Sequence, residues 1–546
     1  MRFSLLALLL LATPAAAAER TVMRRLNRAE YERTICDLLG IRAEFQELLP
    51  PDTSSHNFDN VGEALHVSSF LMERYLEAAD KALGLAIANG PQPPLVKKRY
   101  SLKDTHQVRS STESVYRKRD DTVICFSSSA WNSVVVSPFY PPDRGTYRFR
   151  ISSYAVQSGE KPITFRVDAG PMLMATKNHH IGYFDAKPGA PTVTEWTDHL
   201  EARSTIRIHP YGLANAQTVT KIGAEKYEGP GLAVEWVEVE GPLHESWPPP
   251  SHTAIFGDLP QVKVPMPNNS QRLEVASKDP LADAERILKR FATRAFRRPV
   301  ADAEVQPFVT LVRKKLDAKQ TFEQAVRVGL LGILVAPDFL FLREPAGKLN
   351  DFALASRLSY FLWSSMPDDD LIRVAAAGKL GEAATLREQV ERMLKSPKAA
   401  AFTENFLGQW LSLRDIDSTA PDFRLYPEYD EMLRESMVKE THLFFEDVLK
   451  NDRSLVNFTA SSFTYLNERL AKHYGIAGVS GLHFRRTELP KGSHRGGVMT
   501  MAGVLKVTAN GTNTSPVIRG AWVLDRIWGS GRRRDCPAVL PHHRTY

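Results

Sequence analysis

Aromatic and acidic side chains that could bind a sugar stand close together in the middle third of the chain. Trp196 follows Glu195 directly, and Asp198 comes two residues later. Tyr227 stands among acidic and turn-forming residues. An aromatic ring presents a flat apolar face, and polar groups beside it can form hydrogen bonds. The ring can therefore cover a sugar ring while carboxylates reach its hydroxyl groups. We predict a ligand site formed by Trp196, Tyr227, Glu195 and Asp198.

Core packing is the alternative role for these aromatic residues, because large rings contribute much of the buried area of protein cores. Trp236 alternates in phase with Leu232 and Val234, and this pattern predicts that Trp236 packs in the core of a sheet. The other aromatic candidates of the same segment are Trp131, Tyr140 and Tyr211.

A loop near the N-terminus offers oxygen ligands that could hold Ca²⁺. Its candidate ligands are Asp52, Asp59, Asn60 and Glu63. Calcium takes carboxylate and amide oxygens, but the spacing of these four residues does not follow the EF-hand pattern. The alternative is that the same side chains form turns and cap the helix that follows. No other cofactor is indicated by the sequence.

A Gly-, Thr- and Asn-rich stretch in the last tenth of the chain leads into a predicted helix that begins after Ser515. The amide groups at a helix N-terminus attract anions, and basic residues stand nearby. We predict an anion site here, with the alternative that the stretch is a long loop fixed by its own hydrogen bonds. The candidate residues are Arg495, Lys506, Asn510, Thr512, Ser515 and Arg519.

Motifs of common enzyme classes are absent from the sequence. It contains no G-x-S-x-G, H-E-x-x-H or G-x-G-x-x-G motif. The pair His442 and Glu446 lacks the second histidine of a zinc protease. The three cysteines are far apart, so covalent haem c and cysteine-rich zinc sites are excluded. Catalytic carboxylates leave no motif, and an enzyme site in the C-terminal helical region therefore stays open as the alternative function.

The hydrophobic pattern predicts a multi-domain α+β protein, whose helices and strands hold the candidate residues in place. Period-two alternation over residues 98–242 predicts a β-sandwich or jelly roll. Helical periodicity surrounds it, with a small helical domain before it and a large all-α region after it. The predicted segments are a small helical domain at 19–90, a linker at 243–280, helical domains at 281–345 and 346–478, and a loop-and-helix module at 479–528.

Both ends of the chain carry distinctive patterns. Residues 1–18 combine Arg2, an apolar run and a small-residue cleavage site, which predicts a secretory signal peptide and export. No later segment is long and apolar enough to span a membrane. Residues 529–546 are predicted to be disordered, and their Arg-rich sequence suggests a shifted reading frame. The net charge of +7 is spread along the chain, and this does not indicate nucleic-acid binding.

Several long strings of this sequence resemble one family. They are "RLNRAEYERTICDLLG", "FATRAFRRPV", "LASRLSYFLWSSMPDDDL", "FTYLNERLAKHYGI" and "HRGGVMTMAGVLKVTANGTNTSPVIRGAWVLDRI". These strings resemble planctomycete secreted proteins built from planctomycete-specific and planctomycete-cytochrome-associated domains of unknown function. The segment ending "GLAVEWVEVEGPL" resembles the carbohydrate-binding-module-like jelly roll found in many members. The resemblance implies an exported protein associated with extracellular polymer or redox chemistry, and it assigns no catalytic residues.

The sequence and the resemblance together favour an exported protein that binds carbohydrate or a cell-surface polymer through its β-sandwich. The alternative is a periplasmic enzyme or redox partner with its site in the C-terminal helical region. The sequence does not indicate an oligomeric state.

Overall fold

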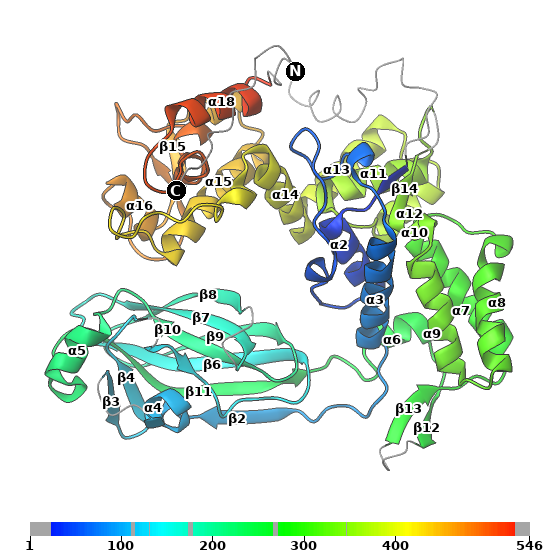
Figure 1. The fold of residues 1–546 in the computed structure, drawn as a ribbon, viewed down its shortest axis with the longest axis horizontal. Helices are drawn as coiled ribbons and strands as arrows, with labels where there is room; N and C mark the ends of the chain where they lie inside the picture. Colours follow the sequence, from blue (N-terminus) through cyan, green and yellow to red (C-terminus); the bar gives the residue numbers. More distant parts are fainter. Residues whose placement is uncertain are drawn as a thin grey trace, which may run out of the picture. The chain divides into compact units, whose positions relative to one another are not determined.

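The computed structural model describes residues 23–110, 115–129, 132–172, 178–265, 271–344 and 347–529. The chain divides into two compact units (Figure 1). The helical unit comprises Met1–Ile87, Ala254–Val262 and Glu274–Tyr546, and the β unit comprises Ala88–Thr253 and Lys263–Leu273. The predicted α+β fold class is confirmed, with antiparallel sheets in the middle of the chain and mainly helices after it. The signal-peptide prediction, Trp131 and the tail beyond Gly529 lie outside the described residues.

Two sheets form most of the β unit. One has four strands in the order β5-β10-β7-β8, and the other has six, in the order β3-β4-β11-β6-β9 with β2 paired to β11. The strands are β2 (Val96–Tyr100), β3 (Tyr116–Arg119), β4 (Thr122–Cys125), β5 (Val134–Val135), β6 (Gly145–Val156), β7 (Ile163–Pro171), β8 (His179–Ala186), β9 (Thr192–Leu200), β10 (Ser204–Pro210) and β11 (Gly231–Leu243). Two short helices, α4 (His106–Ser110) and α5 (Ala216–Ile222), accompany them.

One hydrophobic core lies between the two sheets, so the β unit is a sandwich. Successive side chains of a strand point to opposite faces, and the apolar members of each strand point inward. Phe149 and Ile151 of β6 meet Phe165 and Val167 of β7 in this core, and all four side chains are excluded from solvent. The alternation in the sequence predicted this arrangement.

A β-bulge in β11 shows that the prediction for Trp236 is wrong. The register of β11 against β6 shifts between Val234 and Trp236, and one inserted residue exchanges the two faces of the strand beyond it. Val234 and Val237 are both fully buried as a result. Trp236 lies on the outer face, where the guanidinium carbon of Arg99 is 4.1 Å from the centre of its ring.

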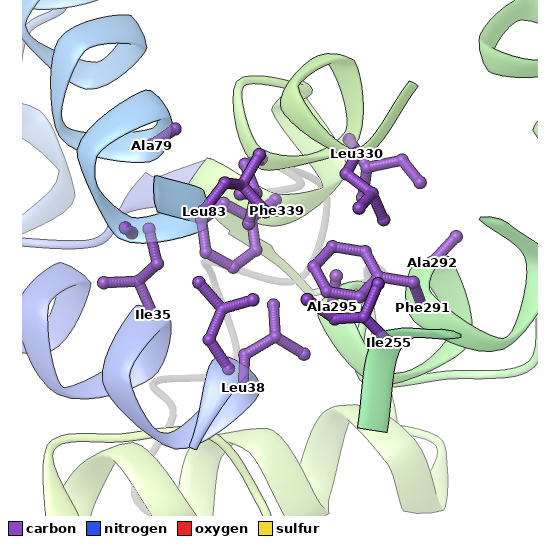
Figure 2. Packing of buried hydrophobic residues seen from close by; sticks show 14 of the residues in the cluster. Ile35, Leu38, Ala79, Leu83, Ile255, Phe291, Ala292, Ala295, Leu330 and Phe339 are labelled. Carbon is purple, nitrogen blue, oxygen red and sulfur yellow. The ribbon is translucent and has the colours of Figure 1, made fainter. Parts of the chain in front are cut away.

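The predicted N-terminal domain is not separate from the helical domain predicted at 281–345, because both contribute to one hydrophobic core (Figure 2). Ile35 and Leu83 pack in the same cluster as Phe291, Leu330 and Phe339. The elements are β1 (Met23–Arg25), which pairs with β14 (Phe341–Arg343), and the helices α2 (Arg28–Leu39), α3 (Ser69–Ala86), α7 (Pro280–Ala295), α8 (Asp302–Asp317), α9 (Phe322–Leu334) and α10 (Pro337–Leu340).

The described residues of the linker predicted at 243–280 include a helix and two strands. They are α6 (Pro250–Phe256) and the two strands β12 (Gln261–Pro265) and β13 (Gln271–Val275). Ile255 and Phe256 are buried in the core of the helical unit. The Pro-rich composition suggested a linker, but these apolar residues complete a core that is built from distant parts of the chain.

The C-terminal half of the helical unit has further clusters of buried residues. Its elements are α11 (Asp351–Trp363), α12 (Asp369–Ala376), α13 (Ala383–Lys395), α14 (Ala400–Trp410), α15 (Glu431–Lys450), β15 (Phe463–Leu466), α16 (Glu468–Tyr474), β16 (Arg485–Glu488), α17 (Ala502–Val507) and α18 (Pro516–Arg526). Phe444 of α15 shares a cluster with Val504 and Trp522, so the predicted module at 479–528 is not independent of the domain before it. None of the described helices is long and apolar enough to cross a membrane.

Local signals placed the helix ends correctly. Asn27 and Glu30 form a capping box at the start of α2, and Gly40 ends the helix in the left-handed conformation. Ser515 caps α18, and Pro516 is its first residue.

Candidate functional site

The outer face of the four-stranded sheet carries a dense set of polar and aromatic side chains. Three of its four strands, β10, β7 and β8, lie side by side. These strands, together with Tyr211 directly after β10, place the residues on the same face. We call this set the polar face. Its members are Thr164, Arg166 and Asp168 from β7, His180, Tyr183 and Asp185 from β8, and Arg207, His209 and Tyr211 from the end of β10 onward.

The strand register explains how these residues come together. Arg166 is paired with His209 on one side and with Tyr183 on the other. A register shift in β8 opposite Val167 and Asp168 puts His180 and Tyr183 on one face although they are three residues apart. The bulge therefore adds a histidine to the face that regular alternation would point inward.

Asp168 is the centre of the electrostatic network on the polar face. It is 6% exposed, and one carboxylate oxygen lies 2.8 Å from a guanidinium nitrogen of Arg166 and 3.0 Å from Nε2 of His209. The other oxygen lies 3.1 Å from Nδ1 of His180. Burial would raise the pKa of Asp168, but the two imidazoles and the arginine outweigh it and hold this pKa well below its usual range. Asp168 therefore stays ionised and keeps its three neighbours in place.

Two tyrosines border this network and are partly exposed. The ring of Tyr183 lies 4.8 Å from the imidazole of His180 and 6.2 Å from the ring of Tyr211, measured between centroids. Tyrosine combines an apolar ring with a hydroxyl group that forms hydrogen bonds. The polar face thus offers aromatic surface beside fixed donors and acceptors, which is the combination a sugar requires.

Arg207 has a structural role at the edge of the same face. Its guanidinium donates hydrogen bonds to Oδ1 of Asn178 at 2.7 Å and to the carbonyl of Met172 at 3.2 Å, as well as to the carbonyl of Pro171. These bonds tie the end of β7 to the start of β8.

Trp196 does not provide the exposed platform that the sequence predicted. Its indole stacks on Phe149, with ring centroids 5.3 Å apart, and on Phe184 of the opposite sheet, with centroids 5.1 Å apart. The side chain is only partly exposed and packs against the core of the sandwich. The polar residues around Trp196 suggested a surface position, but β9 is an alternating strand in which Trp196 shares the inward phase with Leu200.

The other members of the predicted sugar site are separated from one another. Glu195 points to the outer face of the six-stranded sheet, where it accepts a 2.5 Å hydrogen bond from Nε of Arg150. Asp198 pairs with His179 at 2.5 Å. Tyr227 packs edge-on against Phe126, with centroids 5.3 Å apart. The structure therefore does not bring Trp196, Tyr227, Glu195 and Asp198 into one site.

Both aspartates of the predicted calcium loop form ion pairs with arginine side chains. Asp52 lies 2.7 Å from a guanidinium nitrogen of Arg25 and accepts a hydrogen bond from the amide of Arg28. Asp59 pairs with Arg414 and accepts a hydrogen bond from the side chain of Asn27. No group of three His, Cys, Asp or Glu side chains that could hold a metal ion occurs among the described residues.

Lys506 and Arg519 of the predicted anion site form hydrogen bonds within the protein. Lys506 is 9% exposed and donates hydrogen bonds to the carbonyls of Ile416 and Thr419, and burial lowers its pKa. Arg519 donates to the hydroxyl of Thr508 at 3.2 Å. These two cations therefore fix the loops around α17.

The uncharged residues of that prediction form a local turn and a helix cap. Oδ1 of Asn510 accepts hydrogen bonds from the amides of Thr512 and Asn513 at 3.1 and 2.7 Å, and Ser515 caps α18. Arg495 lies 3.7 Å from the ring centre of Tyr474. The alternative, a long loop fixed by its own hydrogen bonds, describes this stretch.

Glu440 is a buried acid that the sequence did not single out. It lies on α15, is 1% exposed, and accepts hydrogen bonds from Thr464 at 2.6 Å and Tyr474 at 2.5 Å. Burial raises the pKa of Glu440 to about 7, although these hydrogen bonds and the charge of Arg495 act against the shift. Such a pKa suits acid–base catalysis, but the closed surroundings keep a substrate away from the carboxyl group. We therefore assign Glu440 a structural role.

Comparisons with protein families match three stretches of the helical unit. Residues 24–88 match the family PSD3, described as a protein of unknown function (DUF1587). Residues 283–344 match PSD5, a protein of unknown function (DUF1595), and residues 349–476 match PSD4, a protein of unknown function (DUF1592). The resemblance to domains of unknown function is thereby confirmed.

Comparison with curated proteins gave no match. Among solved structures, a carbohydrate-binding module from the Cellvibrio mixtus lichenase 5A, in complex with cellotriose, is similar to part of this chain. The similarity covers 26% of this chain and 96% of that chain, at 14% sequence identity and a TM-score of 0.16.

Proposed function

We propose that the β unit binds a carbohydrate polymer on its polar face. The observation that carries the proposal is the position of Tyr183 and Tyr211 beside the ionised network around Asp168. A sugar presents apolar C–H groups and hydroxyl groups in close alternation, so its binding site needs aromatic surface and hydrogen-bonding groups at short range.

The network also lowers the cost of ordering the site on binding. Asp168 already fixes Arg166, His180 and His209 in the free protein, and groups that are ordered beforehand lose less conformational freedom when a ligand binds. Three neighbouring strands are about 10 Å across. This width favours a chain of sugar units over a single small molecule.

The proposal places this binding outside the cytoplasm. Residues 1–18 have the order of regions found in secretory signal peptides, and the motifs of the helical unit resemble those of planctomycete secreted proteins. Both inferences support a protein that meets extracellular or cell-surface polymers.

The test is a titration of the full chain with soluble neutral and acidic polysaccharides, followed by calorimetry and by retardation in polysaccharide-containing gels. We expect Tyr183→Ala and Tyr211→Ala each to weaken binding about 5- to 150-fold, by analogy with the stacking of aromatic side chains on nucleic-acid bases.

Trp236→Ala is the matched control, because it removes an aromatic residue from the outer face of the other sheet. Its affinity should equal that of the wild type. The proposal is wrong if no polysaccharide binds the wild type, or if Trp236→Ala weakens binding as much as the tyrosine variants do.

A further inference from the structure

A cavity of about 200 Å³ opens in the helical unit, between the end of α7, the segment around β14 and the first half of α11. Phe296, Phe341 and Phe352 form apolar parts of its wall. Its charged lining consists of Arg297, Arg298, Arg343, Arg357, Asp338 and Glu344. Four arginines and two carboxylates give this lining an excess of positive charge.

Arg297 makes the back of the cavity rigid. It is 4% exposed, and its guanidinium donates hydrogen bonds to the carbonyls of Asp338 at 2.8 Å and Phe341 at 3.0 Å, and to the hydroxyl of Tyr360 at 3.2 Å. These bonds fix the chain that leads into β14, and they hold the neighbouring Arg298 at the cavity wall.

The two carboxylates position the other arginines without using all of their donors. Asp338 accepts hydrogen bonds from both Arg298 at 3.1 Å and Arg343 at 3.0 Å. Glu344 accepts from Nε and Nη2 of Arg357. A guanidinium group carries five N–H donors, so Arg343 and Arg357 each keep donors for a ligand.

The start of α11 adds to the positive character of the cavity. Asn350 caps this helix, and Ala353 in its first turn also lines the cavity. The N-terminus of a helix carries a partial positive charge and favours anions. The helix end and the arginines thus act on the same small volume.

We propose that this cavity binds a small ligand that bears a carboxylate or phosphate group. The oxyanion is held by Arg343 and Arg357, whose planar donor groups match the geometry of both anions. The phenylalanine side chains of the wall contact the rest of the ligand. The cavity is smaller than the usual range for drug-sized ligands, about 300–1,000 Å³, so a metabolite-sized anion fits it best. This site is independent of the carbohydrate proposal, because all of its residues belong to the helical unit.

The experiment is a calorimetric titration of the full chain with inorganic phosphate and, separately, with benzoate, at constant ionic strength in chloride. We expect saturable binding of at least one of the two probes by the wild type. Arg343→Gln should weaken this binding at least about tenfold, the loss expected for a hydrogen bond to a charged group. The side chain of Arg343 is 59% exposed, so this variant should fold.

Arg373→Gln is the matched control, since Arg373 is an exposed arginine of the same unit that also pairs with an aspartate. It should bind the probe as the wild type does, and the melting temperatures of both variants should stay near that of the wild type. The proposal is overturned if neither probe binds saturably, or if Arg343→Gln and Arg373→Gln have equal effects.

Discussion

Replacing Glu440 by glutamine should stabilise the protein above neutral pH, and the effect should disappear in mild acid. The carboxyl group is 1% exposed and its pKa is raised from 4.5 to about 7. Glutamine has the same shape and no charge. Its amide group can accept a hydrogen bond from one of the hydroxyl groups of Thr464 and Tyr474 and donate a hydrogen bond to the other. A hydroxyl group can act as donor or as acceptor, so both contacts can be kept.

The magnitude follows from the linkage between proton binding and folding. Each pKa unit corresponds to about 1.4 kcal/mol, so a rise from 4.5 to about 7 corresponds to roughly 3 kcal/mol. The folded state binds the proton more tightly than the unfolded state. The contribution of Glu440 to stability is therefore fully present below pH 4.5, and it is lost as the pH rises to about 7.

The assay is urea denaturation of the wild type and Glu440→Gln at several pH values from about 5 to about 8. The difference between their free energies of unfolding should grow with pH in favour of the variant, by up to about 3 kcal/mol. Glu446→Gln is the control on the same helix. Glu446 forms a partly exposed ion pair with Lys450, and its loss should cost less than about 0.5 kcal/mol. A pH-independent difference for Glu440→Gln, or a less stable variant at high pH, would refute the reasoning.

Two further substitutions test the structural roles assigned to residues that the sequence placed in binding sites. Trp196→Ala should lower the free energy of unfolding by about 3 kcal/mol, because the indole stacks on Phe149 and Phe184. Trp236→Ala should lower it by only about 1 kcal/mol, through the loss of the contact with Arg99. Thermal melts compare the two variants, and equal losses of stability would contradict the assignment. Lys506→Met should lower the free energy of unfolding by about 2 kcal/mol, because it leaves two loop carbonyls without their donor. Urea denaturation measures this loss, and Lys472→Met at an exposed position is the control. If Lys506→Met loses no more stability than this control, Lys506 does not fix these loops.

Local features of the fold could be predicted well because they depend on residues close in sequence. The capping box of Asn27 and Glu30 needs only four consecutive positions, and the caps of α18 need two. The alternation of apolar residues likewise indicated the sandwich, since each strand carries its own pattern. The predicted domain boundaries were wrong because they depend on contacts between residues far apart in sequence. Phe256 looks like part of a Pro-rich linker until its distant partners in the core are known.

The candidate site could be predicted only in part, because β-bulges decide which side chains share a face. Regular alternation put Trp236 in the core, and one inserted residue moved it to the outside. Another bulge brings His180 to the side of Tyr183. The alternation of Thr164 and Arg166 with apolar residues was visible in the sequence. Only the pairing of three strands shows that these residues surround Asp168.

Hydrogen–deuterium exchange of the full chain, with and without a bound polysaccharide, tests the central claim most directly. Ligand bound to the polar face should slow exchange in peptides that cover β7, β8 and β10, and Tyr211→Ala should reduce this protection at the same polysaccharide concentration. Slowed exchange confined to the outer face of the six-stranded sheet, or to the helical unit, would contradict the claim that the polar face binds carbohydrate.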